Sequence, residues 1–119
     1  MEKIIVQNVR YPVKDAYSSA EMYFSLMSVV NHLALTSREI GLISYMAVNG
    51  SVLTKEVRDT FCQEHNSTVA TVNNITCRLK KLHLLEKENN KLRITPVLSV
   101  NFGMNVSLNI RMMYGPEGK

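Results

Sequence analysis

The stretch RLKKLHLLEKENNKLRITP, residues 78–96, decides the fold because it joins a basic helix end directly to a β-hairpin pattern. Residues 84–87 predict a short strand, residues 88–90 a tight polar turn, and residues 91–95 a returning strand. Asn89 and Asn90 suit the tip of this turn, since asparagine tolerates left-handed backbone geometry. The prediction is a helix followed at once by a hairpin, with basic residues on both.

The charge of the chain is concentrated in this stretch. Residues 78–93 hold six Lys or Arg against two Glu, which equals the formal net charge of +4 of the whole chain. The other 103 residues carry eight basic and eight acidic side chains and sum to zero. A local excess of this kind is expected of a surface that binds phosphate. A solvated, lysine-rich surface is the other interpretation of the same pattern.

The segment before the hairpin, residues 67–82, has helical periodicity and predicts a helix capped by Ser67. At 100° per residue its apolar side gathers six residues that we expect in the core: Val69, Val72, Ile75, Thr76, Leu79 and Leu82. The opposite side starts small and polar and ends basic. It carries Ser67, Ala70, Thr71, Asn73, Asn74, Cys77, Arg78 and Lys81.

Three more helices are predicted earlier in the chain. The first lies in residues 18–34, with one apolar stripe formed by Met22, Leu26, Val29, Val30 and Leu33. Thr36 followed by Glu39 is a capping box, so a second helix begins there and ends at the Asn49-Gly50 pair. A short third helix falls within residues 53–65.

Both ends of the chain predict β-strands. Residues 3–13 are rich in β-branched and aromatic side chains, and every second residue from Leu98 to Met112 is apolar. We expect one α+β domain over residues 1–119: an N-terminal strand in 1–15, helices and hairpin in 16–96, and a C-terminal β extension in 97–119. The extension pairs either with the N-terminal strand or with a second copy, and we expect a homodimer through it.

About four helices followed by a hairpin is the layout of a winged helix-turn-helix domain, in which the last helix fits a major groove. Residues 35–96 also resemble the winged-helix regulators of the MarR type. Eight residues match the step that follows the recognition helix of that family: Arg78, Leu79, Lys80, Lys81, Leu84, Leu85, Glu86 and Lys87. His83 stands where the family usually has Gly.

Two other families share parts of this region. The runs TKEVRD, KKLHLLEK and LRITP are similar to the N-terminal winged-helix half of the middle-transcription activators of T-even phages. The run LTSREIGLISYMAVNG is similar to LuxR-type DNA-binding domains, but those lack the hairpin. The resemblance implies a small transcription or replication regulator of phage-like or plasmid-like origin.

The expected partner is double-stranded DNA. Asn74 can present its amide to adenine, Arg78 can reach guanine or the backbone, and the hairpin cations can contact phosphate. The complete set of expected DNA-binding residues is Ser67, Ala70, Thr71, Asn73, Asn74, Arg78, Lys81, Lys87, Asn89, Asn90, Lys91 and Arg93. A winged-helix module that docks on RNA polymerase or another protein is the alternative.

Other classes have less support in the sequence. There is no apolar run of the ~20 residues that cross a membrane and no secretory leader pattern, so we expect a cytoplasmic protein of a bacterial or phage-infected cell. Cys62 with His65, and Cys77 with His83, could supply four zinc ligands, but Cys77 and His83 lie on different sides of one helix. No catalytic pattern or phosphate-binding glycine loop is present, so we expect neither an enzyme nor a cofactor.

Overall fold

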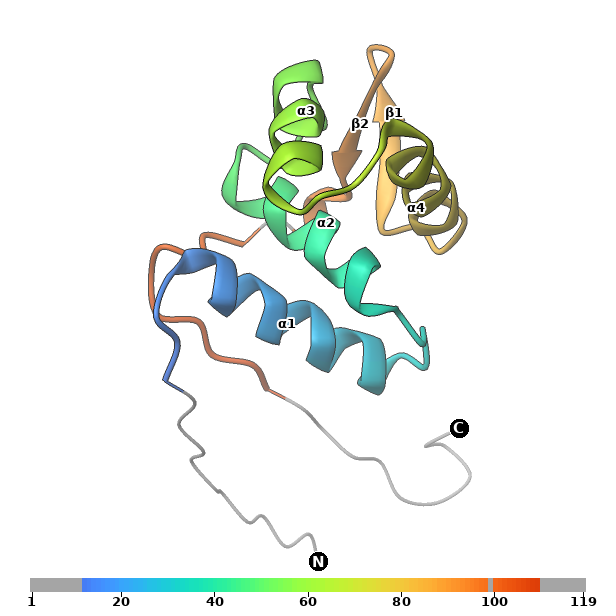
Figure 1. Cartoon of the computed structure of the whole chain (residues 1–119). Coiled ribbons are helices and arrows are strands. Elements are labelled where there is room, and N and C mark those ends of the chain that lie inside the picture. Colours follow the sequence, from blue (N-terminus) through green and yellow to red (C-terminus); the bar gives the residue numbers. More distant parts are fainter. Residues whose placement is uncertain (1–11, 99, 110–119) are drawn as a thin grey trace, which may run out of the picture.

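The computed structural model describes residues 12–98 and 100–109. Four helices are followed by an antiparallel hairpin and a 3-10 turn (Figure 1). The elements are α1 (Ala16–Val30), α2 (Ser37–Val48), α3 (Lys55–Glu64), α4 (Val69–Lys81), β1 (Leu85–Glu88), β2 (Lys91–Ile94) and η1 (Pro96–Leu98). The predicted α+β class with four helices and a hairpin is therefore confirmed. In the described part of the chain, no helix is long and apolar enough to cross a membrane.

Each helix begins at a side chain that caps it. The predicted capping box is confirmed: the Thr36 hydroxyl accepts from the Glu39 amide, and the Glu39 carboxylate accepts from the Thr36 amide. The prediction that Ser67 caps the fourth helix is wrong. Thr68 is the cap, because its hydroxyl accepts from the Thr71 amide, whereas the Ser67 hydroxyl is buried and makes no hydrogen bond with the described residues.

The helices also end alike, with a residue in the left-handed conformation just after the cap. These residues are His32, Gly50, Asn66 and His83, with φ of 55°, 94°, 52° and 63°. After α4, the His83 amide donates to the Lys80 carbonyl and the Leu84 amide to the Leu79 carbonyl, which is the Schellman pattern. A glycine usually holds this position at no steric cost, so His83 makes the same tight turn under strain.

The hairpin has the predicted polar tip. Asn89 and Asn90 both have positive φ, 52° and 64°, as a two-residue hairpin turn requires. The register pairs Leu85 with Ile94 at the buried end and Glu88 with Lys91 at the tip. The segment between α2 and α3 pairs with the outer edge of β2. There the Leu53 amide donates to the Leu92 carbonyl and the Ile94 amide to the Ser51 carbonyl, both at 2.9 Å.

The core lies between α1, α2, α4 and the hairpin. Its fully buried large side chains come from all of these elements: Phe24, Leu42, Ile43, Met46, Val72, Leu79, Leu85 and Ile94. On α4, four of the six predicted core residues are buried, Leu82 is half-buried, and Val69 is 44% exposed.

The predicted stripe of α1 is wrong. The helix buries Ala20, Tyr23, Phe24 and Ser28 instead, and Val29 is 73% exposed. Both sides of this helix carry apolar residues, and the side with the two aromatic rings, which offer more area to bury, faces the core.

The predicted C-terminal β extension is corrected as far as the structure describes it. Residues 98 and 100–109 contain no strand, although Leu98 and Phe102 are buried. The Phe102 ring lies 5.3 Å from that of Tyr23 and 6.0 Å from that of Phe24, so this residue of the alternation packs on α1 without a strand.

The other predictions for the two ends of the chain concern residues that the structure describes only in part. Residues 1–11 and 110–119, which carry most of the predicted N-terminal strand and the end of the extension, lie outside the described residues. Residues 12–15 precede α1 and are not in a strand.

Candidate functional site

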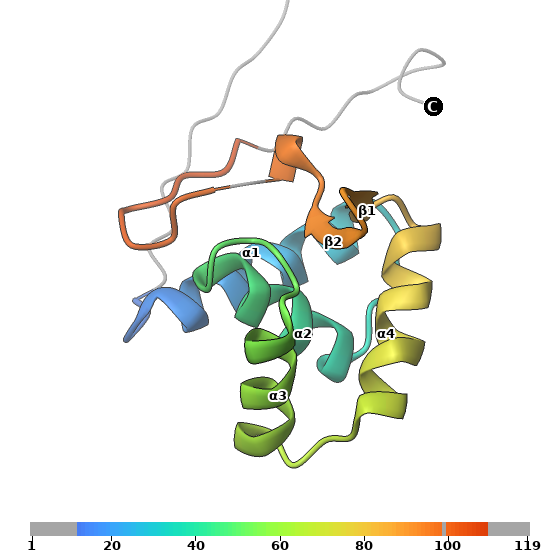
Figure 2. The same cartoon turned by 90° about the horizontal axis from the view of Figure 1, so that it is seen from above.

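A basic groove lies between α3, α4 and the hairpin. Figure 2 shows α3 and α4 joined by a loop at one end of the molecule, with the hairpin near the other end of α4. The groove has a volume of about 680 Å³, and its lining contains six cationic side chains and no carboxylate. We call it the basic groove, and its lining is Leu53, Thr54, Lys55, Arg58, Asn73, Thr76, Cys77, Lys80, Lys81, Lys87, Asn90, Lys91 and Leu92.

The α3 wall is formed by the first two turns of that helix. Thr54 caps α3 by accepting from the Val57 amide, so the N-terminal end of the helix opens at the groove. Lys55 and Arg58 stand three residues apart and therefore share one side of the helix. The aligned peptide dipoles add partial positive charge at this end. This wall consequently favours an anion through Lys55 and the backbone, while Arg58 already pairs with Asp59 at 3.6 Å.

The α4 wall begins polar and ends basic. The Thr76 hydroxyl donates to the Asn73 carbonyl at 3.0 Å, but neither the Asn73 nor the Asn74 carboxamide has a hydrogen-bond partner among the described residues. Lys80 and Lys81 follow Cys77 at the C-terminal end of the helix, and all three are exposed. The Asn73 carboxamide on this wall can therefore donate to and accept from a ligand, whereas Asn74 is outside the groove lining.

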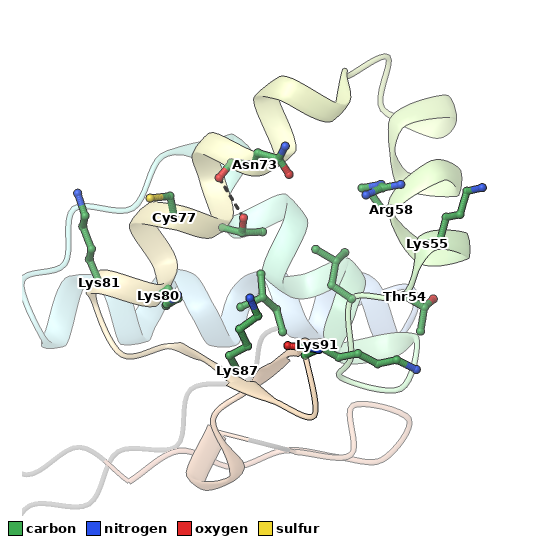
Figure 3. Close-up of a pocket in the computed structure, with 13 residues that line it drawn as sticks. Thr54, Lys55, Arg58, Asn73, Cys77, Lys80, Lys81, Lys87 and Lys91 are labelled. Atoms are coloured by element: carbon green, nitrogen blue, oxygen red, sulfur yellow. Dashed lines mark hydrogen bonds between the residues drawn. The ribbon is translucent and has the colours of Figure 1, made fainter.

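The hairpin supplies the third wall. Figure 3 shows Arg58 of α3 and Lys87 of β1 pointing into the space between the helices, while Lys55, Lys81 and Lys91 extend outward along its rim. This arrangement places positive charge on three sides of one concavity. The lining itself has no carboxylate, although Asp59 beside it pairs with Arg58 at 3.6 Å. The five lysines of the lining therefore carry the positive charge that attracts extended anions.

Two of the predicted cations are engaged elsewhere. The Arg78 guanidinium forms an ion pair with Glu39, and its second nitrogen donates to the Leu33 carbonyl at 3.0 Å. Arg93 forms an ion pair with Glu88 on the neighbouring strand. Neither residue lines the basic groove.

The Arg78 contact ties α4 to the segment between α1 and α2. The Glu39 side chain is 7% exposed and that of Arg78 is 40% exposed. Burial raises the pKa of the Glu39 carboxyl. Hydrogen bonds from Arg78 and the Thr36 amide, together with the charge of Arg78, outweigh burial and lower the pKa below its ordinary value. Arg78 therefore has a structural role in this arrangement.

The structure brings together some of the predicted site residues. Five of the twelve line the groove: Asn73, Lys81, Lys87, Asn90 and Lys91. Ala70 and Asn74 are exposed on α4 and Asn89 at the hairpin tip, but none of them lines the groove. The Thr71 hydroxyl bonds to that of Thr68, and Ser67 is half-buried before α4.

Eight lining residues were not among the predicted site residues: Thr54, Lys55, Arg58, Lys80, Leu53, Thr76, Cys77 and Leu92. The signal for the first three was present in TKEVRD, where a capping threonine is followed by two cations on one side of a helix. Lys80 was counted in the charge cluster but was not placed at the site.

The cysteines and histidines do not converge. Within the described residues, no three metal-ligating side chains of the His, Cys, Asp and Glu types come together. The His65 ring stacks on Phe61 with centroids 4.5 Å apart, and Cys62 is half-buried.

No protein-family model, curated protein or solved structure matches this chain. The basic groove and the exposed side of α4 beside it are therefore the features of the molecule that bear on its function.

Proposed function

We propose that this chain is a winged helix-turn-helix protein that binds double-stranded DNA, with α4 as the recognition helix and the hairpin as the wing. The observation that carries the proposal is the basic groove, whose cations come from α3, α4 and the hairpin and whose lining has no carboxylate. A phosphate backbone is the extended polyanion that such a groove fits.

The exposed side of α4 supports duplex DNA over a small anion. The helix has 13 residues, about 20 Å of length, and a major groove about 12 Å wide admits one helix. Ala70, Asn73 and Asn74 are exposed on it and carry no charge, so a base edge can approach without an opposing carboxylate. The cations then position the duplex, and the amides contact the bases.

Arg78 and Arg93 are not part of this proposal, because each already forms an ion pair. Arg58 is left out for the same reason, since it pairs with Asp59 at 3.6 Å. The phosphate contacts are assigned to Lys55, Lys80, Lys81, Lys87 and Lys91. A role as a transcription or replication regulator in a bacterial or phage-infected cytoplasm is the setting we propose for this activity. A homodimer through the C-terminal region stays a prediction, since the described part of that region forms no strand.

A salt titration tests the proposal. The affinity of the full chain for a random-sequence duplex is measured by gel shift over a range of salt concentrations. Its logarithm should fall by about 0.9 per phosphate contact for each decade of salt. Lys91→Ala should weaken binding to all duplexes about equally and lower the slope by ~1.

Lys14→Ala is the matched control, because Lys14 is exposed before α1 and does not line the basic groove. Its slope should equal that of the wild type. The proposal is wrong if the wild type shows no salt-dependent binding, or if Lys91→Ala and Lys14→Ala have the same slope.

A protein-docking module is the second candidate, and one observation favours it. Val29 and Val30 are 73% and 47% exposed next to each other on α1, outside the basic groove. Docking on an apolar surface of this kind depends little on salt. The same titration therefore separates the two functions.

A further inference from the structure

We infer that Val69 and Ala70 read the methyl group of thymine and that the DNA site consequently contains A·T pairs where the first turn of α4 enters the major groove. The inference rests on the proposed DNA binding and adds the base preference. Its starting point is the exposed side chain of Val69, which the apolar periodicity predicts to be in the core.

The exposure of Val69 is not required by the packing of α4. That helix is held by Val72, Ile75, Thr76 and Leu79, which are all buried, whereas Val69 at the first position is 44% exposed. Ala70 beside it is exposed too. The first turn of α4 therefore presents two apolar side chains to the solvent, next to a helix side that is otherwise polar.

On the exposed side of α4, the N-terminal half is uncharged and the C-terminal half is basic. Positions 69–74 hold no charged side chain, and the cations begin at Arg78. Groove-lining cations hold the phosphate backbone at the C-terminal half of α4, so the uncharged N-terminal half is the part that can meet base edges. The first residues of a recognition helix usually make these contacts.

Two pairs of residues on α4 each combine an apolar side chain with an asparagine amide at a spacing of four residues. Val69 lies four residues before Asn73, and Ala70 lies four residues before Asn74, so each pair shares one side of the helix. One helical turn rises about 5.4 Å, which spans one to two base-pair steps of about 3.4 Å. In the major groove an asparagine amide matches adenine, and an apolar side chain matches the C5-methyl of thymine. Both preferences select A·T pairs at neighbouring positions.

The test uses the full chain and duplexes selected from a random pool for tight binding. Thymines of the selected duplex are replaced one at a time by uracil, which lacks only the C5-methyl. For the wild type, at least one replacement should weaken binding about fourfold, the value of one buried methyl-sized group. Val69→Ser should bind the thymine and uracil duplexes with equal affinity at the position that Val69 contacts.

Val29→Ser is the matched control, because Val29 is more exposed than Val69 and lies on α1, outside the basic groove. It should keep the full preference for thymine. If the wild type binds and selects duplex DNA but tolerates uracil at every position, the inference is overturned and DNA binding stands. If no duplex is bound in a salt-dependent way, both fail. Loss of the preference in Val29→Ser as well would overturn the role of Val69.

Discussion

Helix α4 supplies one cation to the contact with the start of α2 and others to the basic groove. The cation at the first region is paired, and those at the second are open to a ligand. Arg78 turns towards the start of α2, where it pairs with the buried carboxylate of Glu39, and it also donates to the Leu33 carbonyl in the α1–α2 segment. Lys81 lies three residues later, lines the groove, and forms no ion pair with the described residues. The two side chains contribute equally to a count of charges, but only one of them is available to a ligand.

This difference shows what a charge cluster in a sequence can and cannot indicate. Residues 78–93 account for the net charge of +4, yet two of their six cations are paired in the structure. The partner of Arg78 lies 39 residues earlier in the chain, so local composition gives no sign of it. A surface for a polyanion is defined by the cations that lack a partner and by the absence of carboxylates around them.

Replacing Arg78 should have the largest effect on stability. Removing one partner of a fully buried ion pair costs about 3–5 kcal/mol. Because 40% of the Arg78 side chain is exposed, water can partly replace it. We therefore expect Arg78→Ala to lower the free energy of unfolding by about 2–3 kcal/mol in urea denaturation.

The matching change on the groove side is Lys81→Ala, which should alter the free energy of unfolding by less than about 0.5 kcal/mol. Equal stability of the two variants would remove the distinction between the two surfaces.

Replacing Glu39 by Gln should have a smaller effect at neutral pH, about 1–2 kcal/mol, since the amide oxygen still accepts from Arg78 and Thr36 but without charge. The pKa of Glu39 is lowered in the folded protein. Its contribution to stability is therefore present above the unfolded-state pKa of about 4.3 and is lost as pH falls through the folded-state pKa.

Denaturation of both proteins between pH 7 and pH 3 measures this linkage. The wild type should lose more stability than Glu39→Gln as the pH falls below about 4.3. Parallel curves would mean that Glu39 is not held as a carboxylate by Arg78.

His83→Gly should change the free energy of unfolding least, and it should raise this free energy instead of lowering it. The substitution leaves Arg78, Glu39 and the groove cations unchanged but relieves the left-handed backbone at φ 63°. We expect a gain of about 0.5–1 kcal/mol, because the relief of ~1–2 kcal/mol is partly offset by the larger unfolded-state entropy of glycine. Thermal denaturation measures it, and a loss of stability would indicate that the imidazole makes a contact of its own.

Most patterns local to one element were predicted well from the sequence, although the cap of α4 is Thr68 and not Ser67. The capping box at Thr36, the end of α2 at Gly50 and the Asn89-Asn90 turn each follow from two or three neighbouring residues. These motifs satisfy backbone hydrogen bonds or geometry within a few residues, so distant parts of the chain do not change them.

Features that depend on distant residues were predicted poorly. The orientation of α1 could not be settled from periodicity because both of its sides are apolar. The basic groove combines residues from 53 to 92, so its α3 wall was not apparent from the cluster at 78–93. The alternation after Leu98 predicted strands, whereas Phe102 packs singly against Tyr23 and Phe24.

The backbone pairing between the α2–α3 segment and β2 affects how much of the groove backbone must become ordered when a ligand binds. Leu53 is bonded to Leu92 and Ser51 to Ile94, directly beside the first turn of α3 and the base of the hairpin. These hydrogen bonds join two walls of the groove to each other before anything binds. A polyanion can then bind without these backbone hydrogen bonds having to form. The remaining entropic cost is that of immobilising the long side chains, up to about 1.5–2 kcal/mol for each lysine or arginine.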